Sequence, residues 1–325
     1  MTSRRLHIVA SLKNRLQNSQ VDAIELACMD CGYEVCEHNT LGTAVTELKK
    51  STHNMLMLDT KSMVELLDSQ KVLPTDQFIL CASDRENPAL ARYSTELAGL
   101  RYVIGAPLPH VMRAALASIL EFRMTSSLRG FMPRLLQLQN FESAAQILTN
   151  SAQRSSIQDF VTDFFAQKLA KHKDQMVGGT SSYPKNIGDV VDEFLMNAIW
   201  DAAQNRVLQD RTKPTALDAG EEVLVECVCD GVNMALTVTD PHGSFPATAF
   251  LKPLRYALGL REGTKVNDGP GGAGLGLFMI LQKVTALSYE VEKGKITRAV
   301  ALLRGDQSMR ELQKKPRTVL FFEKP

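Results

Sequence analysis

The chain has 325 residues, of which 44% are hydrophobic and 22% are charged, and its formal net charge at pH 7 is +1. This length accommodates two domains with separate cores, and the balanced charge favours neither nucleic acid nor an acidic membrane as a partner. No apolar run approaches the roughly 20 residues that span a bilayer. The first residues lead into a strand-like segment without the apolar region of a signal peptide. We therefore expect a cytoplasmic protein that contacts neither nucleic acid nor membrane directly.

The first part of the chain alternates short apolar runs with helical patterns. Strand-like runs occur at 6–10, 33–36, 54–59, 77–81 and 101–104, and a long helical pattern follows at 109–123. Repeated βα units predict a parallel, doubly wound sheet with helices on both faces and ligands at the carboxyl ends of the strands. We expect a five-stranded α/β domain over residues 4–124.

This pattern resembles the receiver domain of two-component response regulators, which has a flavodoxin-like fold. The resemblance implies a phosphoacceptor aspartate at the end of the third strand, where Asp59 stands, and a hydroxyl at the position of Ser83. Ala10–Ser11 replaces the acidic pair that holds Mg²⁺ in this family, and Gly105 or Ala106 replaces its lysine. Without these groups, charge neutralisation during phosphoryl transfer is weak. We expect a receiver-like interaction domain in which Asp59 keeps the phosphoacceptor position but carries no phosphate.

Residues 125–142 show no sustained strand pattern and are interpreted as a helical linker, which places the second domain at 143–325. Within that domain, helical patterns cover 155–170 and 187–203. Strand-like runs occur at 145–149, where an edge strand is expected, and at 222–229, 234–240, 288–291, 298–303 and 318–322. The polar, glycine-bearing segment 247–270 is typical of an active-site lid.

Three motifs in the second domain carry chemistry. Glu193 and Asn197 lie four residues apart on a predicted helix, so both project from one face. Asp230–Gly231 between alternating apolar runs predicts a hairpin whose second strand ends at Asp240. The run Gly271-Gly-Ala-Gly-Leu-Gly-Leu277 opens a helix, where backbone N–H groups can bind phosphate. Each motif alone is weak evidence for a nucleotide site, whereas the three motifs in this order are a more specific indication.

This order resembles the GHKL (Bergerat) ATP-binding fold of histidine kinases, anti-sigma serine kinases, gyrase-type ATPases and the Hsp90 chaperone. The resemblance implies an α/β sandwich with a mixed sheet, and ATP and Mg²⁺ as ligands. It assigns Asn197 to Mg²⁺ coordination, and Glu193 to orienting a metal-bound water or acting as a base. Asp240 would accept a hydrogen bond from the adenine amino group, and Thr297 would lie near adenine.

The phosphate-binding part of the resemblance lies in the glycine loop. Gly272, Gly274 and Gly276 would line the phosphates, and Leu275 and Leu277 belong to the same nucleotide-binding segment. The family's Asp-x-Gly-x-Gly is here Asp240-Pro-His-Gly-Ser244, so Gly243 would restore the tight turn one residue later. The side chains of His242 and Ser244, at positions where the family has glycines, would narrow the adenine pocket that the resemblance implies.

The motifs disfavour a self-phosphorylating histidine kinase. His172 is the only histidine ahead of the ATP-binding motifs in this region, and it lacks the acidic residue and proline that follow the kinase histidine. The chain is closer to the anti-sigma-type serine/threonine kinases. We expect a bacterial signal-transduction protein that binds Mg-ATP and phosphorylates a protein partner, with the receiver-like domain used for interaction. The alternative is a non-catalytic adaptor, nucleotide-bound or nucleotide-free. The sequence leaves both enzymatic activity and homodimer formation open.

Overall fold

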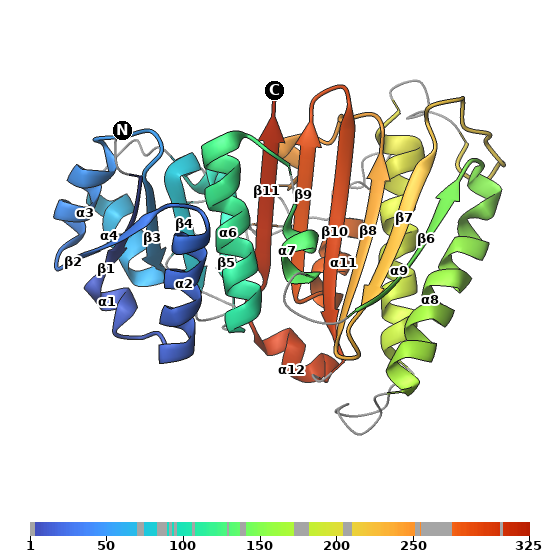
Figure 1. Cartoon of the computed structure of the whole chain (residues 1–325). Helices are drawn as coiled ribbons and strands as arrows, with labels where there is room; N and C mark the ends of the chain where they lie inside the picture. The colour runs from blue at the N-terminus through green and yellow to red at the C-terminus, as the bar shows by residue number, and fades with distance from the viewer. Residues whose placement is uncertain are drawn as a thin grey trace. The chain divides into compact units, whose positions relative to one another are not determined.

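The structure is a computed structural model of the whole chain and describes residues 4–69, 75–82, 90, 93, 96–105, 108–128, 130–136, 141–171, 182–203, 210–250, 254, 275–305 and 308–325. The chain is α/β, with parallel and antiparallel strands (Figure 1). It divides into two compact units. The first comprises Met1–Leu138, Leu254–Thr264 and Lys315–Phe321, and the second comprises the remainder. Among the described residues, no helix has both the length and the apolar character needed to cross a membrane.

The first unit contains a parallel sheet with the strand order β2-β1-β3-β4-β5. Its strands are β1 (Arg5–Val9), β2 (Glu34–His38), β3 (Met55–Asp59), β4 (Phe78–Ala82) and β5 (Tyr102–Gly105). Every residue of β3 and β4 is buried, as expected for parallel strands that are covered on both faces. Each strand begins within one residue of its predicted start, so the parallel sheet is confirmed.

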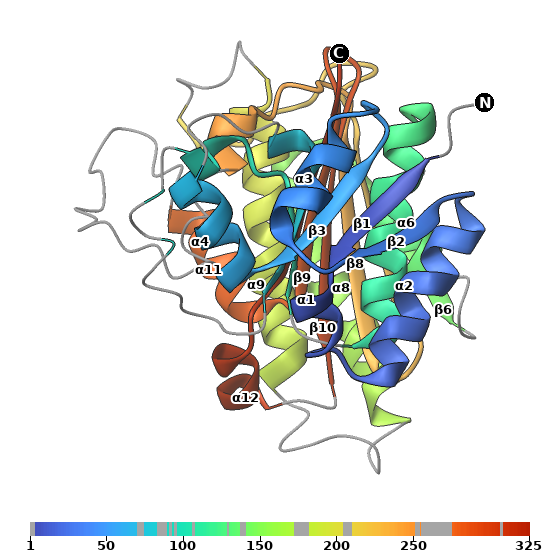
Figure 2. The same cartoon turned by 90° about the vertical axis from the view of Figure 1, so that its left-hand side faces the viewer.

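Helices cover both faces of this sheet. They are α1 (Ala10–Lys13), α2 (Asn18–Asp30), α3 (Leu41–Leu48), α4 (Thr60–Ser69), α6 (Pro109–Thr125) and α7 (Phe131–Leu136), with short 3₁₀ turns at Thr75–Gln77 and Glu96–Gly99. Figure 2 shows α2 and α6 on one side of the strands and α4 on the other. The sequence patterns did not identify α4, which follows β3 directly and places buried Met63, Leu66 and Leu67 against the sheet.

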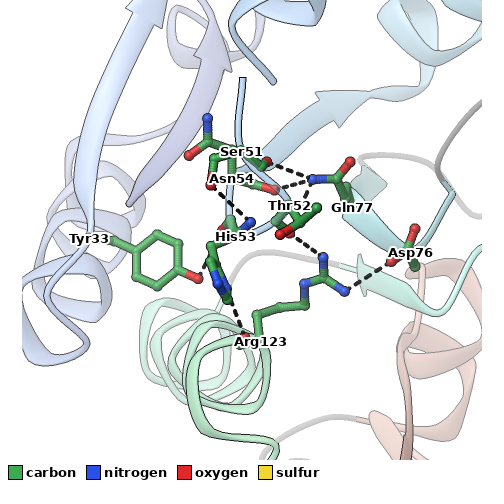
Figure 3. A network of polar contacts seen from close by, with 8 residues as sticks. All are labelled: Tyr33, Ser51, Thr52, His53, Asn54, Asp76, Gln77 and Arg123. Carbon is green, nitrogen blue, oxygen red and sulfur yellow. Dashed lines mark hydrogen bonds and ion pairs between the residues drawn. The ribbon is translucent and has the colours of Figure 1, made fainter. Parts of the chain in front are cut away.

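A polar network fixes the loop that leads into β3 (Figure 3). The Gln77 amide donates to three backbone carbonyls of segment Ser51–Asn54, at 3.1, 3.3 and 3.0 Å. Arg123 of α6 donates to the Thr52 carbonyl and forms an ion pair with Asp76 at 2.9 Å. This loop lies at the amino ends of the strands, whereas ligands of parallel sheets bind at the carboxyl ends. The network therefore has a structural role.

The C-terminal strand β11 (Thr318–Lys324) pairs antiparallel with β5. The Thr318 hydroxyl donates to the Gly105 carbonyl at 3.0 Å and accepts from the Gly105 N–H at 3.2 Å. A Cβ at Gly105 would lie 2.3 Å from the Arg317 carbonyl oxygen, so position 105 has no room for a side chain. This pairing explains why 315–321 group with the first unit, although the sequence placed them in a domain at 143–325.

The second unit contains an antiparallel sheet with the order β9-β10-β8-β7-β6. The strands are β6 (Glu142–Leu148), β7 (Val223–Cys229), β8 (Asn233–Asp240), β9 (Ala286–Glu292) and β10 (Ile296–Arg304). The predicted hairpin between β7 and β8 is confirmed, with Gly231 at φ 96°. β6 lies at the edge of the sheet, where an edge strand was expected.

The helices of this unit are α8 (Arg154–Ala170), α9 (Ser182–Met196), α11 (Leu275–Lys283) and α12 (Met309–Lys314), with a 3₁₀ turn at Ser151–Gln153. α8 and α9 run side by side, and α9 also contacts α11 and β8 (Figure 1). The helix expected at 187–203 does not continue as a regular α-helix. It becomes a π-helix from Asn197 to Asp201.

Candidate functional site

Asp240 ends β8 and is 5% exposed. The register between β8 and β10 places Thr297 directly opposite it. The Asp240 carboxylate accepts from the His242 N–H at 2.9 Å. Burial raises the pKa of Asp240 to about 7, while the N–H groups of His242 and Gly243 and the Thr297 hydroxyl act in the opposite direction. The carboxyl group therefore exchanges its proton near neutral pH.

Gly243 allows the chain to turn tightly after Asp240. It has a φ of 59°, and a Cβ there would lie 2.0 Å from the Glu292 carbonyl oxygen. The Gly294 N–H, from the turn between β9 and β10, donates to the Gly243 carbonyl at 3.2 Å. Both the left-handed conformation and the close backbone approach require glycine. The turn expected at this position is therefore present.

Glu193 and Asn197 lie one helical turn apart on α9 and at the start of the π-helix. Glu193 is half-buried, and burial raises its pKa, with Asp192 and Asp201 adding to the effect. A carboxyl group with a raised pKa is suited to accepting a proton at neutral pH. Short π-helical segments within helices occur frequently at functional sites. The structure thus provides a base candidate and an amide on one helix.

The Glu193 carboxylate reaches the first turn of α11. A Cβ built on Gly276 would lie 1.5 Å from Glu193 Oε1 and 2.0 Å from Glu193 Cδ, so the carboxylate occupies the space of a missing side chain. A negative charge is favoured there by the helix dipole. Leu275 and Leu277 belong to the same turn of α11, and Leu277 is buried. Gly272 and Gly274 lie outside the described residues.

Tyr289 of β9 joins this site and was not identified from the sequence. Its ring is buried and stacks on Phe245 with 4.1 Å between centroids, with edge contacts to Phe194 and Phe250. Burial, followed by the nearby Glu193 and Asp240 carboxylates, raises its pKa well above the usual value, and the Asn197 side chain opposes this. Its hydroxyl has no hydrogen bond of ordinary geometry among the described residues.

The pairing of β9 with β10 is the feature from which Tyr289 could be identified as a site residue. Val291 is the β9 partner of Thr297, and Tyr289 precedes Val291 by two residues. Side chains alternate along a strand, so Tyr289 shares the sheet face of Thr297. That inference needs the β9–β10 register, which the sequence alone does not provide.

Asp59 ends β3 in the first unit and is 3% exposed. Its Oδ2 pairs with Arg15 Nη1 at 2.7 Å, and its Oδ1 accepts from the Ser62 N–H at 2.7 Å. Both carboxylate oxygens are therefore engaged, and Arg15 supplies the positive charge beside them. Ser83 lies outside the described residues.

Comparison of the sequence with protein-family models finds no match, and no match is found among curated proteins. The resemblance to receiver and GHKL domains therefore rests on the sequence motifs alone.

Proposed function

We propose that the second unit binds Mg-ATP in the manner of GHKL domains. The observation that carries this proposal is the contact between Glu193 and Gly276. It joins the acidic helix motif to the glycine loop, which are distant in sequence. The opposition of Asp240 and Thr297 across β8 and β10 supports the same site from a second direction.

The strand orders are compatible with this assignment. In the first unit, the order β2-β1-β3-β4-β5 is that of flavodoxin-like doubly wound folds, which include receiver domains. In the second unit, antiparallel strands covered by α8 and α9, with α11 packed against α9, are compatible with an α/β sandwich. We therefore assign a receiver-like unit and a GHKL-like unit.

Each residue of the site has a role in this proposal. Asp240 accepts from the adenine amino group, with Thr297 beside it. Asn197 offers an amide oxygen, a hard ligand of the kind that Mg²⁺ prefers. Gly276 lies in the first turn of α11, and the backbone N–H groups of Gly272, Gly274 and Gly276 would bind the phosphates. Magnesium would neutralise phosphate charge once bound.

The proposed reaction is phosphoryl transfer to a protein partner in a bacterial signalling pathway. Glu193 takes the proton of a serine or threonine hydroxyl, the hydroxyl oxygen bonds to the γ-phosphorus, and ADP leaves with the electron pair of the broken P–O bond. Catalysis of this type depends on positioning and charge stabilisation. The first unit serves as an interaction domain, because Arg15 and Ser62 already engage Asp59.

A non-catalytic adaptor is the second candidate. Asp240 is only 5% exposed, and the stacked rings of Tyr289 and Phe245 fill space in the same unit. These observations favour a protein that uses both units for protein–protein contacts, with or without nucleotide.

Titration of ATP with Mg²⁺, followed by calorimetry, tests the proposal. We expect saturable binding by the wild type, strongly weakened binding by Asp240→Asn, and unchanged binding by Asp163→Asn. The last variant alters an exposed acid on α8, away from the site. Absence of saturable binding by the wild type would overturn the nucleotide-dependent versions and leave the nucleotide-free adaptor.

Transfer of labelled phosphate to a co-purifying protein separates the kinase from the adaptor. We expect transfer by the wild type and none by Glu193→Gln, which keeps the size of the side chain beside Gly276. ATP binding should persist in this variant. Binding without any transfer would identify the protein as an adaptor.

A further inference from the structure

Within the part of the chain that the structure describes, the edge strand β6 has one open side. There it pairs only with β7, in the register Glu142–Cys229 to Leu148–Val223, and it is the last strand of its sheet. All its residues except Leu148 are exposed or half-exposed. No proline, lysine or arginine occurs from Phe141 to Leu148. Natural edge strands usually carry such residues to prevent pairing with another chain, so β6 is a template for a further strand.

The two faces of β6 differ. Glu142 forms ion pairs with Lys168 of α8 and with Lys171, which directly follows that helix, so the even-numbered side chains face α8. Because side chains alternate along a strand, the odd-numbered ones face away from α8. Phe141 and Ile147 belong to this second set and are 46% and 59% exposed. The open edge is therefore accompanied by exposed apolar side chains.

We propose that β6 pairs antiparallel with β6 of a second copy of this chain, across a two-fold axis at Ala145. This register places Ser143 opposite Ile147 of the second copy, and Phe141 opposite its Thr149. Phe141 and Ile147 from different copies then become diagonal neighbours on one face, a separation that large side chains bridge. The surface is self-complementary, as a two-fold dimer requires.

Charge also favours a second copy as the occupant. Residues Ser143 to Asn150 carry no charge, and Glu142 is the only charged residue of the strand. In the proposed register, Glu142 lies opposite Leu148 of the second copy, so no like charges face each other. Glu142 also keeps its ion pairs with Lys168 and Lys171. This assembly is independent of nucleotide binding.

Sedimentation equilibrium of the full chain over a range of concentrations tests the dimer. We expect a reversible dimer for the wild type and a dissociation constant raised at least about tenfold in Ile147→Lys, because its charge would be desolvated without a partner. Met279→Lys is the matched control, since Met279 is 47% exposed on α11, away from β6. Circular dichroism confirms that the variants are folded. A wild type that is monomeric at every concentration would overturn the proposal.

Disulfide formation tests the register. Ala145→Cys is made in a Cys36→Ser background, because Cys36 is half-exposed and the other five cysteines are buried. Opposed Cβ atoms in antiparallel strands are about 4.5–5.5 Å apart, close enough for a disulfide after small adjustments. We expect a covalent dimer under mild oxidation, and none with Met279→Cys in the same background. A dimer that tolerates Ile147→Lys and does not cross-link through position 145 uses another surface and contradicts the proposal.

Discussion

The Glu193 carboxylate lies against Gly276 so closely that a Cβ at position 276 would be 1.5 Å from Glu193 Oε1. The place of this acid on α9 therefore depends on the absence of a side chain in the first turn of α11. Glycine at 276 has a role even without nucleotide, because it admits the carboxylate to the amino end of the helix. This contact couples the two halves of the proposed site.

Gly276→Ala should lower the free energy of unfolding by about 1–3 kcal/mol, because the added methyl group overlaps the carboxylate. Combining it with Glu193→Ala should restore part of the loss, with a coupling energy of about 0.5–3 kcal/mol. Urea denaturation of the wild type, both single variants and the double variant measures this cycle. Gly42→Ala is the control. Gly42 lies on helix α3, where a Cβ would meet no atom within 4 Å, so this substitution should not lower the free energy of unfolding. Additive effects of the two substitutions would show that the contact is absent.

Asp240 should make stability fall as pH rises. Its pKa is about 7 in the folded protein and near 3.8 in the unfolded chain, so the folded state holds the proton more tightly between these values. The stability is largest below the lower pKa and decreases until pH passes the upper one. Relative to Asp240→Asn, the wild type should lose about 3 kcal/mol between pH 5 and pH 8. Urea denaturation of both proteins at pH 5 and pH 8 measures this difference in stability. An equal change of stability with pH in the two proteins would contradict the burial of this carboxyl group.

The local features of the site could be predicted from sequence, whereas its long-range contacts could not. Asp240 follows an alternating apolar run, so its place at a strand end is a short-range property. The turn at Gly243 depends likewise on local backbone conformation. Thr297 was named through a family resemblance, and its position opposite Asp240 follows from the β8–β10 register. Registers between strands distant in sequence depend on tertiary packing.

Tyr289 and Arg15 are two residues that could not be identified from the sequence, because their contacts are long-range. In the sequence, Tyr289 has no feature that separates it from other strand residues. Only the fold brings it near the carboxylates of Glu193 and Asp240. Arg15 lies in the short polar segment between α1 and α2, yet it pairs with buried Asp59. The receiver resemblance named Asp59 from its place at a strand end, but it did not indicate the cation that stands beside Asp59.

His7 should make the first unit sensitive to acid. Its ring is 0% exposed, and its Nδ1 lies 2.8 Å from Nε2 of His38. Burial, followed by the neighbouring His38, lowers the pKa of His7 from 6.5 to about 4. The unfolded chain therefore binds the proton more tightly, and stability falls as pH drops from about 6.5 to 4, by up to roughly 3 kcal/mol. Urea denaturation of His7→Gln should show a smaller loss over this range. The control is His53→Gln, an exposed histidine of the same unit, which should keep the wild-type loss.

Arg15 should contribute more to stability than the half-exposed Lys13 nearby. Arg15→Ala leaves the 3%-exposed Asp59 without its cation, and we expect a loss of about 1–3 kcal/mol. Lys13→Ala removes the ion pair with exposed Glu37, and we expect a smaller loss of stability because solvent screens this pair.

Treatment with an acyl phosphate, followed by intact-mass measurement, tests the chemistry of Asp59. The wild type should gain no phosphate, because both carboxylate oxygens are engaged and no lysine or acidic pair replaces the missing groups. Phosphate gained by the wild type but not by Asp59→Asn would show that the Arg15 pair opens and that the receiver chemistry is intact.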